Sequence, residues 1–128
     1  MPVRRILLID DDPTVRDVVA CCLARTDYEL DAPAVDRRHV SAAAMNTILN
    51  GRYDLLLLDL ELPYLNPIEI LDCLTTADIS TEPVAFAAFL PEEIRSDLRV
   101  RGCTRFIEKP FTVDELIGTL KASSPVSA

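Results

Sequence analysis

Short apolar runs alternate with amphipathic stretches along the chain. Two runs, residues 6–9 (ILLI) and 55–58 (LLLL), are apolar at every position, which is typical of strands buried on both faces of a sheet. Three weaker runs predict shorter strands over residues 28–32, 84–89 and 105–108. Each run is followed by a stretch with helical signals, so the pattern predicts strands and helices in strict alternation.

The predicted helix starts carry clear capping signals. Asp12-Pro13 and Asn66-Pro67 each place a capping side chain before a proline, and proline suits the first helical position. Residues 112–115 (TVDE) form a capping box, with Phe111 and Leu116 at the spacing of a hydrophobic staple. These signals predict the first, third and fifth helices.

The second and fourth predicted helices are each followed by a glycine. They cover residues 40–48 and 91–101. Gly51 and Gly102 come just after them, and glycine readily adopts the left-handed conformation that closes a helix. In the fourth helix, Ile94 and Leu98 are predicted to face inward.

Strand and helix repeat five times, and the strands are apolar on both faces. This pattern predicts an α/β fold with a five-stranded parallel sheet, doubly wound, with five helices covering both faces. The expected strand order is 2-1-3-4-5, with the functional crevice at the carboxyl ends of the strands. The length of 128 residues fits one domain, expected over residues 1–122, with a short tail over residues 123–128.

Composition narrows the possible partners. The chain has 13 Lys and Arg against 21 Asp and Glu, a net charge of −8, and 49% hydrophobic residues. Apolar material therefore suffices for a core, and the acidity argues against direct binding to nucleic acid or an anionic membrane. No apolar run approaches the roughly 20 residues of a membrane span, and residues 1–9 do not resemble a secretory signal. A cytoplasmic protein is the expectation.

Cysteine and histidine offer no metal or redox motif. The four cysteines include the adjacent pair Cys21 and Cys22, with Cys73 and Cys103 far apart, so we expect reduced thiols. His39 is the only histidine and is expected at an exposed helix start.

Charged residues follow three of the predicted strands. Asp10 and Asp11 follow the first strand, Asp59 follows the third, and Lys109 follows the fifth. The carboxyl ends of parallel strands meet at one rim, so these side chains should converge there. Three converging carboxylates repel one another unless protons or a cation relieve the repulsion, and oxygen-only ligands suit Mg²⁺. The arrangement predicts Mg²⁺-assisted phosphoryl transfer to Asp59.

Each acid taken singly also has a structural explanation. Acids after strands are often solvated turn residues or helix caps, and Asp12 is expected to be such a cap. The chain has no glycine-rich loop after the first strand, where Asp10 to Asp12 would repel a phosphate lacking a metal, which argues against nucleotide binding. A Mg²⁺-dependent phosphohydrolase using Asp59 as nucleophile is disfavoured, because the chain is short for a cap domain that would enclose a substrate.

Three blocks of the sequence resemble the signature blocks of two-component response-regulator receiver domains. They are residues 6–13 (ILLIDDDP), 53–63 (YDLLLLDLELP) and 106–111 (FIEKPF). The resemblance covers roughly residues 4–122, with matching order and spacing. It implies a phosphoryl donor that is a histidine kinase or a histidine phosphotransfer protein.

The resemblance also implies roles for individual residues. Asp59 would be the phospho-acceptor and would bind Mg²⁺ together with Asp11, while Asp10 would act through a water molecule. The backbone carbonyl of Glu61 would complete the metal site. Lys109 would contact the phosphoryl group, and its peptide bond to the following proline would be cis.

The chain departs from the family pattern near the expected switch. The Thr or Ser that normally ends the fourth strand is replaced by Ala88, or by Ala87 if the alignment slides by one, so the hydroxyl is missing. Phe106 fills the position of the switching aromatic on the fifth strand. Tyr64 and Pro67 stiffen a loop that is commonly rich in glycine.

Two functions remain open from the sequence. The first is a phosphorylatable receiver with weakened or altered switching, showing at most slow self-dephosphorylation and signalling to an unknown downstream protein. The second is a phosphate-independent pseudo-receiver that only binds partners. By analogy with the family, partner binding and possible homodimerisation would use the face formed by the fourth helix, fifth strand and fifth helix. The expectations include no direct nucleic-acid partner and no membrane.

Overall fold

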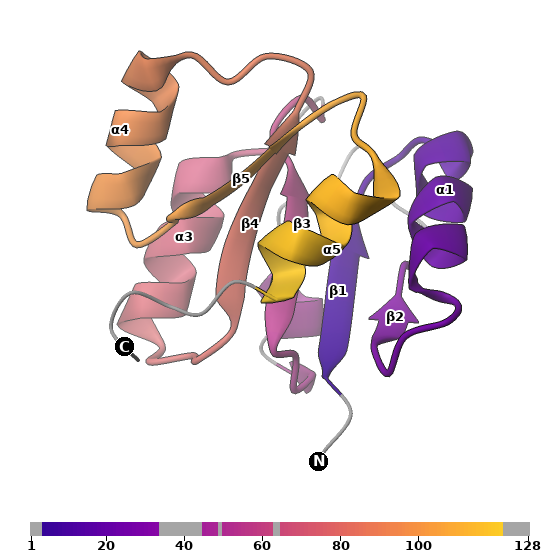
Figure 1. Ribbon diagram of the computed structural model, residues 1–128. Helices are drawn as coiled ribbons and strands as arrows, with labels where there is room; N and C mark the ends of the chain where they lie inside the picture. Colours follow the sequence, from indigo (N-terminus) through magenta and orange to yellow (C-terminus); the bar gives the residue numbers. More distant parts are fainter. Residues whose placement is uncertain (1–3, 34–44, 49, 63–64, 122–128) are drawn as a thin grey trace.

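The five strands form one parallel sheet. The computed structural model describes residues 4–33, 45–48, 50–62 and 65–121. The strand order is β2-β1-β3-β4-β5 (Figure 1). The strands are β1 (Arg5–Ile9), β2 (Glu29–Asp31), β3 (Leu55–Asp59), β4 (Glu82–Ala87) and β5 (Arg105–Glu108). The predicted fold class and strand order are confirmed.

Helices cover both faces of this sheet. They are α1 (Pro13–Leu23), α3 (Pro67–Thr76), α4 (Glu92–Val100) and α5 (Val113–Lys121). Figure 1 shows α1 and α5 on the near face, with α3 and α4 on the other side. Residues 45–48 and 50 are helical and fall in or next to the predicted second helix. The rest of that segment, His39 included, lies outside the described residues, as does the predicted tail over 123–128.

The core has one apolar layer on each side of the sheet. Alternate residues of β1 and β3 point to opposite faces, so each strand supplies both layers. On the α1 and α5 side, the layer contains Ile6, Leu8, Leu55, Leu57, Phe86, Val19, Leu116 and Leu120. On the α3 and α4 side, it contains Leu7, Ile9, Leu56, Leu58, Ile70, Leu71, Leu74 and Leu98. Burial on both faces explains why the strands of the central sheet read as continuous apolar runs.

The predicted caps are present at three helix starts. Asp12 Oδ1 accepts a hydrogen bond from the Thr14 amide at 2.9 Å, and Asn66 Oδ1 accepts one from the Glu69 amide at 3.2 Å. Thr112 and Glu115 bond each other reciprocally, side chain to backbone amide, as a capping box requires. The capping signals therefore placed α1, α3 and α5 correctly.

Three local predictions were wrong. β4 ends at Ala87 rather than at residue 89, so Ala88 and Phe89 lie beyond the strand and are exposed. Ile94 does not face inward: it is 43% exposed, whereas Leu98 is buried. Gly51 does not have a positive φ, although Gly102 does, at 93°.

Close packing explains the glycine at position 51. A Cβ placed there would come within 2.3 Å of the Tyr53 ring. The position therefore needs a residue without a side chain because the ring approaches the backbone, and not because the helix ends in a left-handed conformation.

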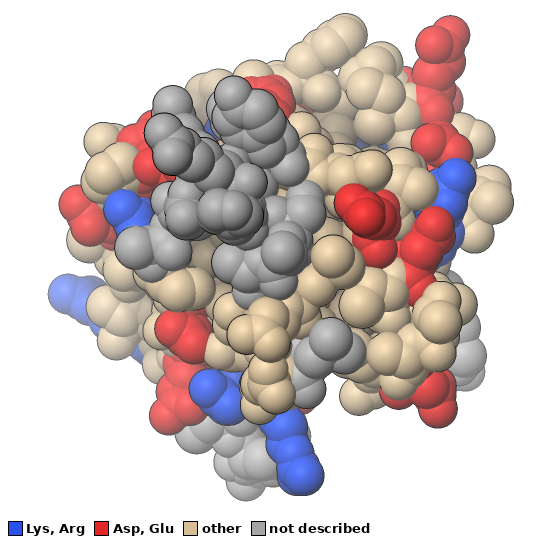
Figure 2. Space-filling model, turned by 180° about the vertical axis from the view of Figure 1, so that it is seen from behind, with Lys and Arg blue, Asp and Glu red and all other residues tan. Residues whose placement is uncertain are grey.

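The surface mixes charges of both signs. Figure 2 shows separate acidic and basic side chains over the face opposite to that of Figure 1. Ion pairs between such groups include Arg99 with Glu92 at 2.6 Å and Arg101 with Asp72 at 3.1 Å. Within the described part of the chain, no helix has the length and apolar character needed to cross a membrane.

Candidate functional site: an acidic cluster at the carboxyl ends of the strands

Three aspartates converge where β1 and β3 end. The two strands are neighbours, with Ile9 paired to Leu58, so the residues that follow, Asp10 and Asp59, lie side by side. Carboxylate oxygens of Asp10, Asp11 and Asp59 all lie within 4.8 Å of one another. Asp10 is fully buried and Asp59 is 4% exposed, while Asp11 is partly exposed. The predicted convergence of these residues is therefore observed.

Lys109 reaches the same cluster from the end of β5. Its Nζ lies 3.3 Å from Asp10 Oδ2 and 3.2 Å from Asp59 Oδ2. The side chain crosses the end of β4 with its ammonium 4.4 Å from the centroid of the Phe86 ring. The Lys109–Pro110 peptide bond is cis, as the resemblance implied.

Backbone amides orient both buried carboxylates. Asp10 Oδ1 accepts a hydrogen bond from the Asp12 amide, and Asp59 Oδ1 accepts one from the Glu61 amide, each at 2.9 Å. In each case the acceptor is the oxygen that does not contact Lys109. The two carboxylates thus hold equivalent positions, each fixed by an amide two residues further along and by the same ammonium group.

Burial leaves the cluster electrostatically strained. Desolvation raises the pKa of Asp59 from 3.8 to about 6, assisted by the charge of Asp10 and opposed by the Glu61 amide and by Lys109. Burial works against the charge of Lys109 as well, but Asp59 and Asp10 outweigh it and raise the pKa of that group. Lys109 therefore stays protonated at neutral pH and faces more than one negative charge.

The donor set fits a hard divalent cation. Asp10 and Asp59 both pair with one ammonium, and the Asp11 carboxylate lies beside them, so these two buried acids carry more negative charge than Lys109 neutralises. The grouped ligand atoms are all oxygens, which suits Mg²⁺ better than Zn²⁺ or copper. A second positive charge at this rim would stabilise the ionised form of Asp59.

The two residues of the expected switch lie on the last two strands of the sheet or next to them. Ala88 follows the last residue of β4 and is exposed. Phe106, on β5, is partly buried against the core, and its ring centroid lies 5.2 Å from the Arg95 guanidinium and 5.3 Å from that of Arg99. Arg95 also pairs with Glu108 at 2.6 Å. Tyr64 lies outside the described residues.

Two contacts of the site were not predicted. Glu61 Oε1 accepts a hydrogen bond from the Ala88 amide at 2.6 Å, which joins the loop after β3 to the end of β4. Phe86 lies beneath the Lys109 ammonium. Phe86 pairs with Asp59 in the parallel register, so an explicit register prediction could have placed its ring at the site. No sequence signal indicates the Glu61 contact.

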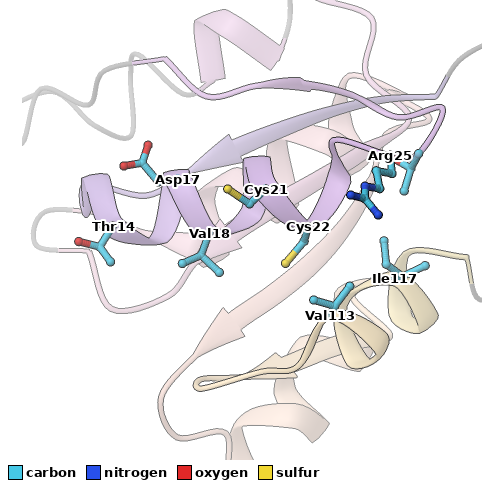
Figure 3. Close-up of a pocket in the computed structure, with 9 residues that line it drawn as sticks. Thr14, Asp17, Val18, Cys21, Cys22, Arg25, Val113 and Ile117 are labelled. Atoms are coloured by element: carbon cyan, nitrogen blue, oxygen red, sulfur yellow. The ribbon is translucent and has the colours of Figure 1, made fainter.

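Two hollows lie along α1, and neither of them is lined by Asp10, Asp11 or Asp59. A groove of about 610 Å³ between α1 and α5 is lined by Val18, Cys21, Cys22, Val113 and Ile117, among others (Figure 3). A second hollow, of about 380 Å³, is lined by Lys109 and Ala88 on the side of the cluster. Thr14 and Val18 line both, so the apolar surface of α1 extends to the rim of the acidic cluster.

Comparison with known sequences identifies the family. A family model described as the response regulator receiver domain matches residues 6–121. The chain is 30% identical over 125 residues to the phosphate regulon transcriptional regulatory protein PhoB of Pseudomonas aeruginosa, covering 93% of this chain and 51% of that protein. It is also 30% identical over 120 residues to TcrA of Mycobacterium tuberculosis, covering 94% and 46%. The chain thus spans about half the length of these curated relatives.

Solved structures agree on the fold. The signal receiver domain of a Luxo repressor protein from Vibrio parahaemolyticus superposes with a TM-score of 0.83 at 23% identity, covering 93% of this chain and 88% of that one. The response regulator TrrA from Thermotoga maritima, solved in complex with Mg²⁺–BeF, has a TM-score of 0.73 at 27% identity, covering 92% and 96%. With the family model matching nearly its whole length, the chain belongs to the receiver domains of two-component response regulators.

Proposed function

We propose that this receiver domain accepts a phosphoryl group on Asp59 in a Mg²⁺-dependent reaction and signals through protein contacts. The observation that carries the proposal is the position of the Asp59 carboxylate. One oxygen is fixed by the Glu61 amide, the other lies 3.2 Å from Lys109, and Asp10 and Asp11 stand beside it. A carboxylate held this way can act as a nucleophile next to a cation site.

The metal would be held by residues already in place. Asp11 and Asp59 would bind Mg²⁺ directly with the backbone carbonyl of Glu61, and Asp10 would act through a water molecule. Bound Mg²⁺ would offset part of the charge on the phosphoryl oxygens. The complex of TrrA with Mg²⁺–BeF supports this assignment, because TrrA shares the fold at 27% identity.

The residues of the chain supply the rest of the chemistry. An Asp59 oxygen forms a bond to phosphorus as the P–N bond of a phosphohistidine donor, or the P–O bond of a small acyl phosphate, breaks. The leaving group keeps the bonding electron pair and takes a proton from solvent. Asp59 must be ionised to attack, and its pKa of about 6 allows this at neutral pH. The Lys109 ammonium stabilises the transferring group.

The missing hydroxyl at position 88 alters the expected switch. A methyl group cannot hydrogen-bond the phosphoryl group, and such a bond to a charged group contributes about 1.5–3 kcal/mol. Typical allosteric coupling energies are about 1–3 kcal/mol, so its loss removes a contribution of the same size. We therefore propose weakened or altered switching in which Phe106 does not respond as in other receivers. Slow self-dephosphorylation is the most catalysis we expect.

Partners follow from the same assignment. The phosphoryl donor would be a histidine kinase or a histidine phosphotransfer protein that approaches over the hollow shared by Lys109 and the apolar surface of α1. A downstream protein, or a second copy, would bind the face formed by α4, β5 and α5, where Val100 is 84% exposed. A cytoplasmic location fits these partners.

The test is the intact mass of the protein after incubation with Mg²⁺ and acetyl phosphate. We expect a phosphoryl-sized increment in the wild type that is absent in Asp59→Asn. Asp12→Asn is the matched control, because asparagine still caps α1 and the increment should persist. The specific observation favouring the alternative, a phosphate-independent pseudo-receiver, is the absent hydroxyl at Ala88. A wild type that gains no mass from acetyl phosphate or a phosphohistidine donor would establish that alternative.

A further inference from the structure

A carboxylate–amide hydrogen bond joins the loop after β3 to the end of β4. Glu61 Oε1 accepts from the Ala88 amide at 2.6 Å, across 27 positions of sequence. Through its own amide, Glu61 also donates to Asp59 Oδ1 at 2.9 Å. One residue therefore contacts both the acceptor carboxylate and the first amide beyond β4. Short distances are typical of hydrogen bonds to charged acceptors.

The hydrogen bond uses the backbone amide of Ala88. The side chain of Ala88 is a methyl group and cannot donate, so the backbone N–H is its hydrogen-bond donor, and this N–H is bonded to Glu61. The neighbouring carbonyl of Ala87 accepts from the Lys109 amide at 2.8 Å and continues the pairing of β4 with the end of β5. The end of β4 is thus held on one side by the sheet and on the other by the Glu61 carboxylate.

The bond is placed where a phosphoryl group would disturb it. Both Glu61 and Ala88 are exposed, so water competes for the bond and a nearby anion can displace it. Phosphorylation would convert the Asp59 carboxylate, with one negative charge, into an acyl phosphate with up to two, on the side chain that the Glu61 amide already contacts. The added negative charge repels the Glu61 carboxylate, and the repulsion acts on the side chain that carries the bond.

We propose that Glu61 tethers the end of β4 in the unphosphorylated protein and that phosphorylation of Asp59 releases this tether. The inference rests on the proposed function, since it needs a phosphoryl group on Asp59. In this chain, phosphorylation would then act by breaking a hydrogen bond at Ala88. In a receiver with a hydroxyl at that position, it would act by forming one. Release frees the segment 88–91 that leads into α4.

The tether is released because Glu61 is charged. Two substitutions of Glu61 should therefore behave differently after phosphorylation. Glu61→Ala removes the tether in both states. Glu61→Gln keeps an acceptor oxygen but no charge, so a bond to the Ala88 amide persists after phosphorylation. Glu69→Gln is the matched control, because it makes the same chemical change at an exposed position in the first turn of α3, while the Ala88 amide donates to Glu61.

The experiment follows the backbone amides of Ala88 and Leu60 by NMR in the full chain, with and without Mg²⁺ and beryllofluoride. Without beryllofluoride, Glu61→Ala should move the Ala88 amide proton upfield and speed its hydrogen exchange about tenfold, the loss of one hydrogen bond to a charged group. Glu69→Gln should leave Ala88 unchanged. Adding Mg²⁺ and beryllofluoride to the wild type should move Ala88 in the same direction as Glu61→Ala does, and should move it little in Glu61→Gln.

Three results would overturn the inference, and they are distinguishable. An Ala88 amide unaffected by Glu61→Ala would show that the tether does not form. A response at Leu60 with none at Ala88 would show that the phosphoryl mimic binds without releasing the tether, which leaves the proposed function intact. No response at either amide, together with no mass increment from acetyl phosphate, would overturn the proposed function and the release with it.

Discussion

Two charged clusters at opposite ends of the sheet differ in their balance of charge. At the amino ends of the strands, Arg105 is 7% exposed and pairs with Glu82 at 2.9 Å, and its guanidinium also donates to the Leu120 carbonyl at 3.2 Å. At the carboxyl ends, Asp10 and Asp59 share one lysine, and the Asp11 carboxylate lies beside them. In the first cluster, the charge of Arg105 is balanced by the Glu82 carboxylate and the Leu120 carbonyl. The second has more negative charge than its lysine neutralises.

The difference separates a structural ion pair from a binding site. Arg105 joins the start of β5 to β4 and to the last turn of α5, so its interactions are complete within the fold. The acidic cluster raises the pKa of Asp59 because burial and Asp10 outweigh Lys109 and the Glu61 amide. Such a cluster gains stability from an added cation. Removing the cation of the first cluster should therefore lower the free energy of unfolding, whereas removing a negative charge from the second should raise it.

The largest expected effect is at the balanced cluster. Arg105→Met removes the buried cation, leaves Glu82 without this partner and leaves the Leu120 carbonyl without this donor. We expect the free energy of unfolding to fall by about 3 kcal/mol, the low end for breaking a buried pair, because Glu82 is half-exposed. Urea denaturation measures it. Arg99→Met removes an exposed cation of α4 paired with Glu92 and is the control, with an expected change below about 1 kcal/mol.

Removing a charge from the acidic cluster should have the opposite sign. The folded protein binds a proton at Asp59 more tightly than the unfolded chain, since its pKa is about 6 against an ordinary 3.8. In metal-free protein the free energy of unfolding should therefore fall as pH rises from about 4 to about 6, by at most about 3 kcal/mol from this group. Asp59→Asn should remove that decline and be the more stable protein at pH 7.

Denaturation of both proteins in EDTA across this pH range tests the prediction. Asp12→Asn serves as control, because it makes the same Asp-to-Asn change at the cap of α1. Its free energy of unfolding should fall with rising pH as in the wild type. An Asp59→Asn variant that is less stable than the wild type at pH 7 would contradict the charge imbalance.

The lysine of the acidic cluster should compete with a bound cation. Lys109→Met removes the positive charge that lies 3.2 Å from Asp59 and 3.3 Å from Asp10. Mg²⁺ should then bind on the order of tenfold more tightly, while transfer from acetyl phosphate slows. Calorimetric titration with Mg²⁺ measures the affinity. Lys121→Met, at the end of α5, should leave it unchanged, and a weaker affinity in Lys109→Met would count against direct competition.

The smallest effect concerns Asp12, which stands beside the acidic cluster without belonging to it. Asp12→Ala removes the cap of α1 and should lower the free energy of unfolding by about 1 kcal/mol. Because Asp12 is not among the three clustered carboxylates, Mg²⁺ affinity should stay within about twofold, a change of less than 0.5 kcal/mol. A large loss of affinity would extend the cation site to a fourth acid.

Local chemistry made much of the fold predictable. Some signals depend only on residues a few positions apart, so they can be read from the sequence alone. They are the fully apolar runs at β1 and β3 and the helix caps at Asp12, Asn66 and Thr112. The end of β4 was predicted two residues too late, because residues 87–89 are all apolar and carry no polar stop signal. Ile94 looked like a core residue by spacing, but only Leu98 of that pair is buried.

The site was predictable as far as topology alone determines it. Asp10 and Lys109 follow strands and Asp59 ends one, and the carboxyl ends of these strands meet at one edge, so predicting their convergence required only the strand order. The Glu61 contact with Ala88 depends on one side-chain rotamer and on where β4 stops, and neither leaves a pattern in the sequence. The role of Gly51 likewise depended on a ring that packs against it in three dimensions.

Anomalous diffraction from crystals of the wild-type protein soaked in Mn²⁺ tests the acidic cluster as a cation site, because Mn²⁺ binds the same oxygen ligands as Mg²⁺. We expect an anomalous peak within coordination distance of the carboxylates of Asp11 and Asp59, next to Lys109. No peak at this rim at saturating Mn²⁺, with Lys109 still bridging Asp10 and Asp59, would contradict the claim that excess negative charge makes the acidic cluster a cation site.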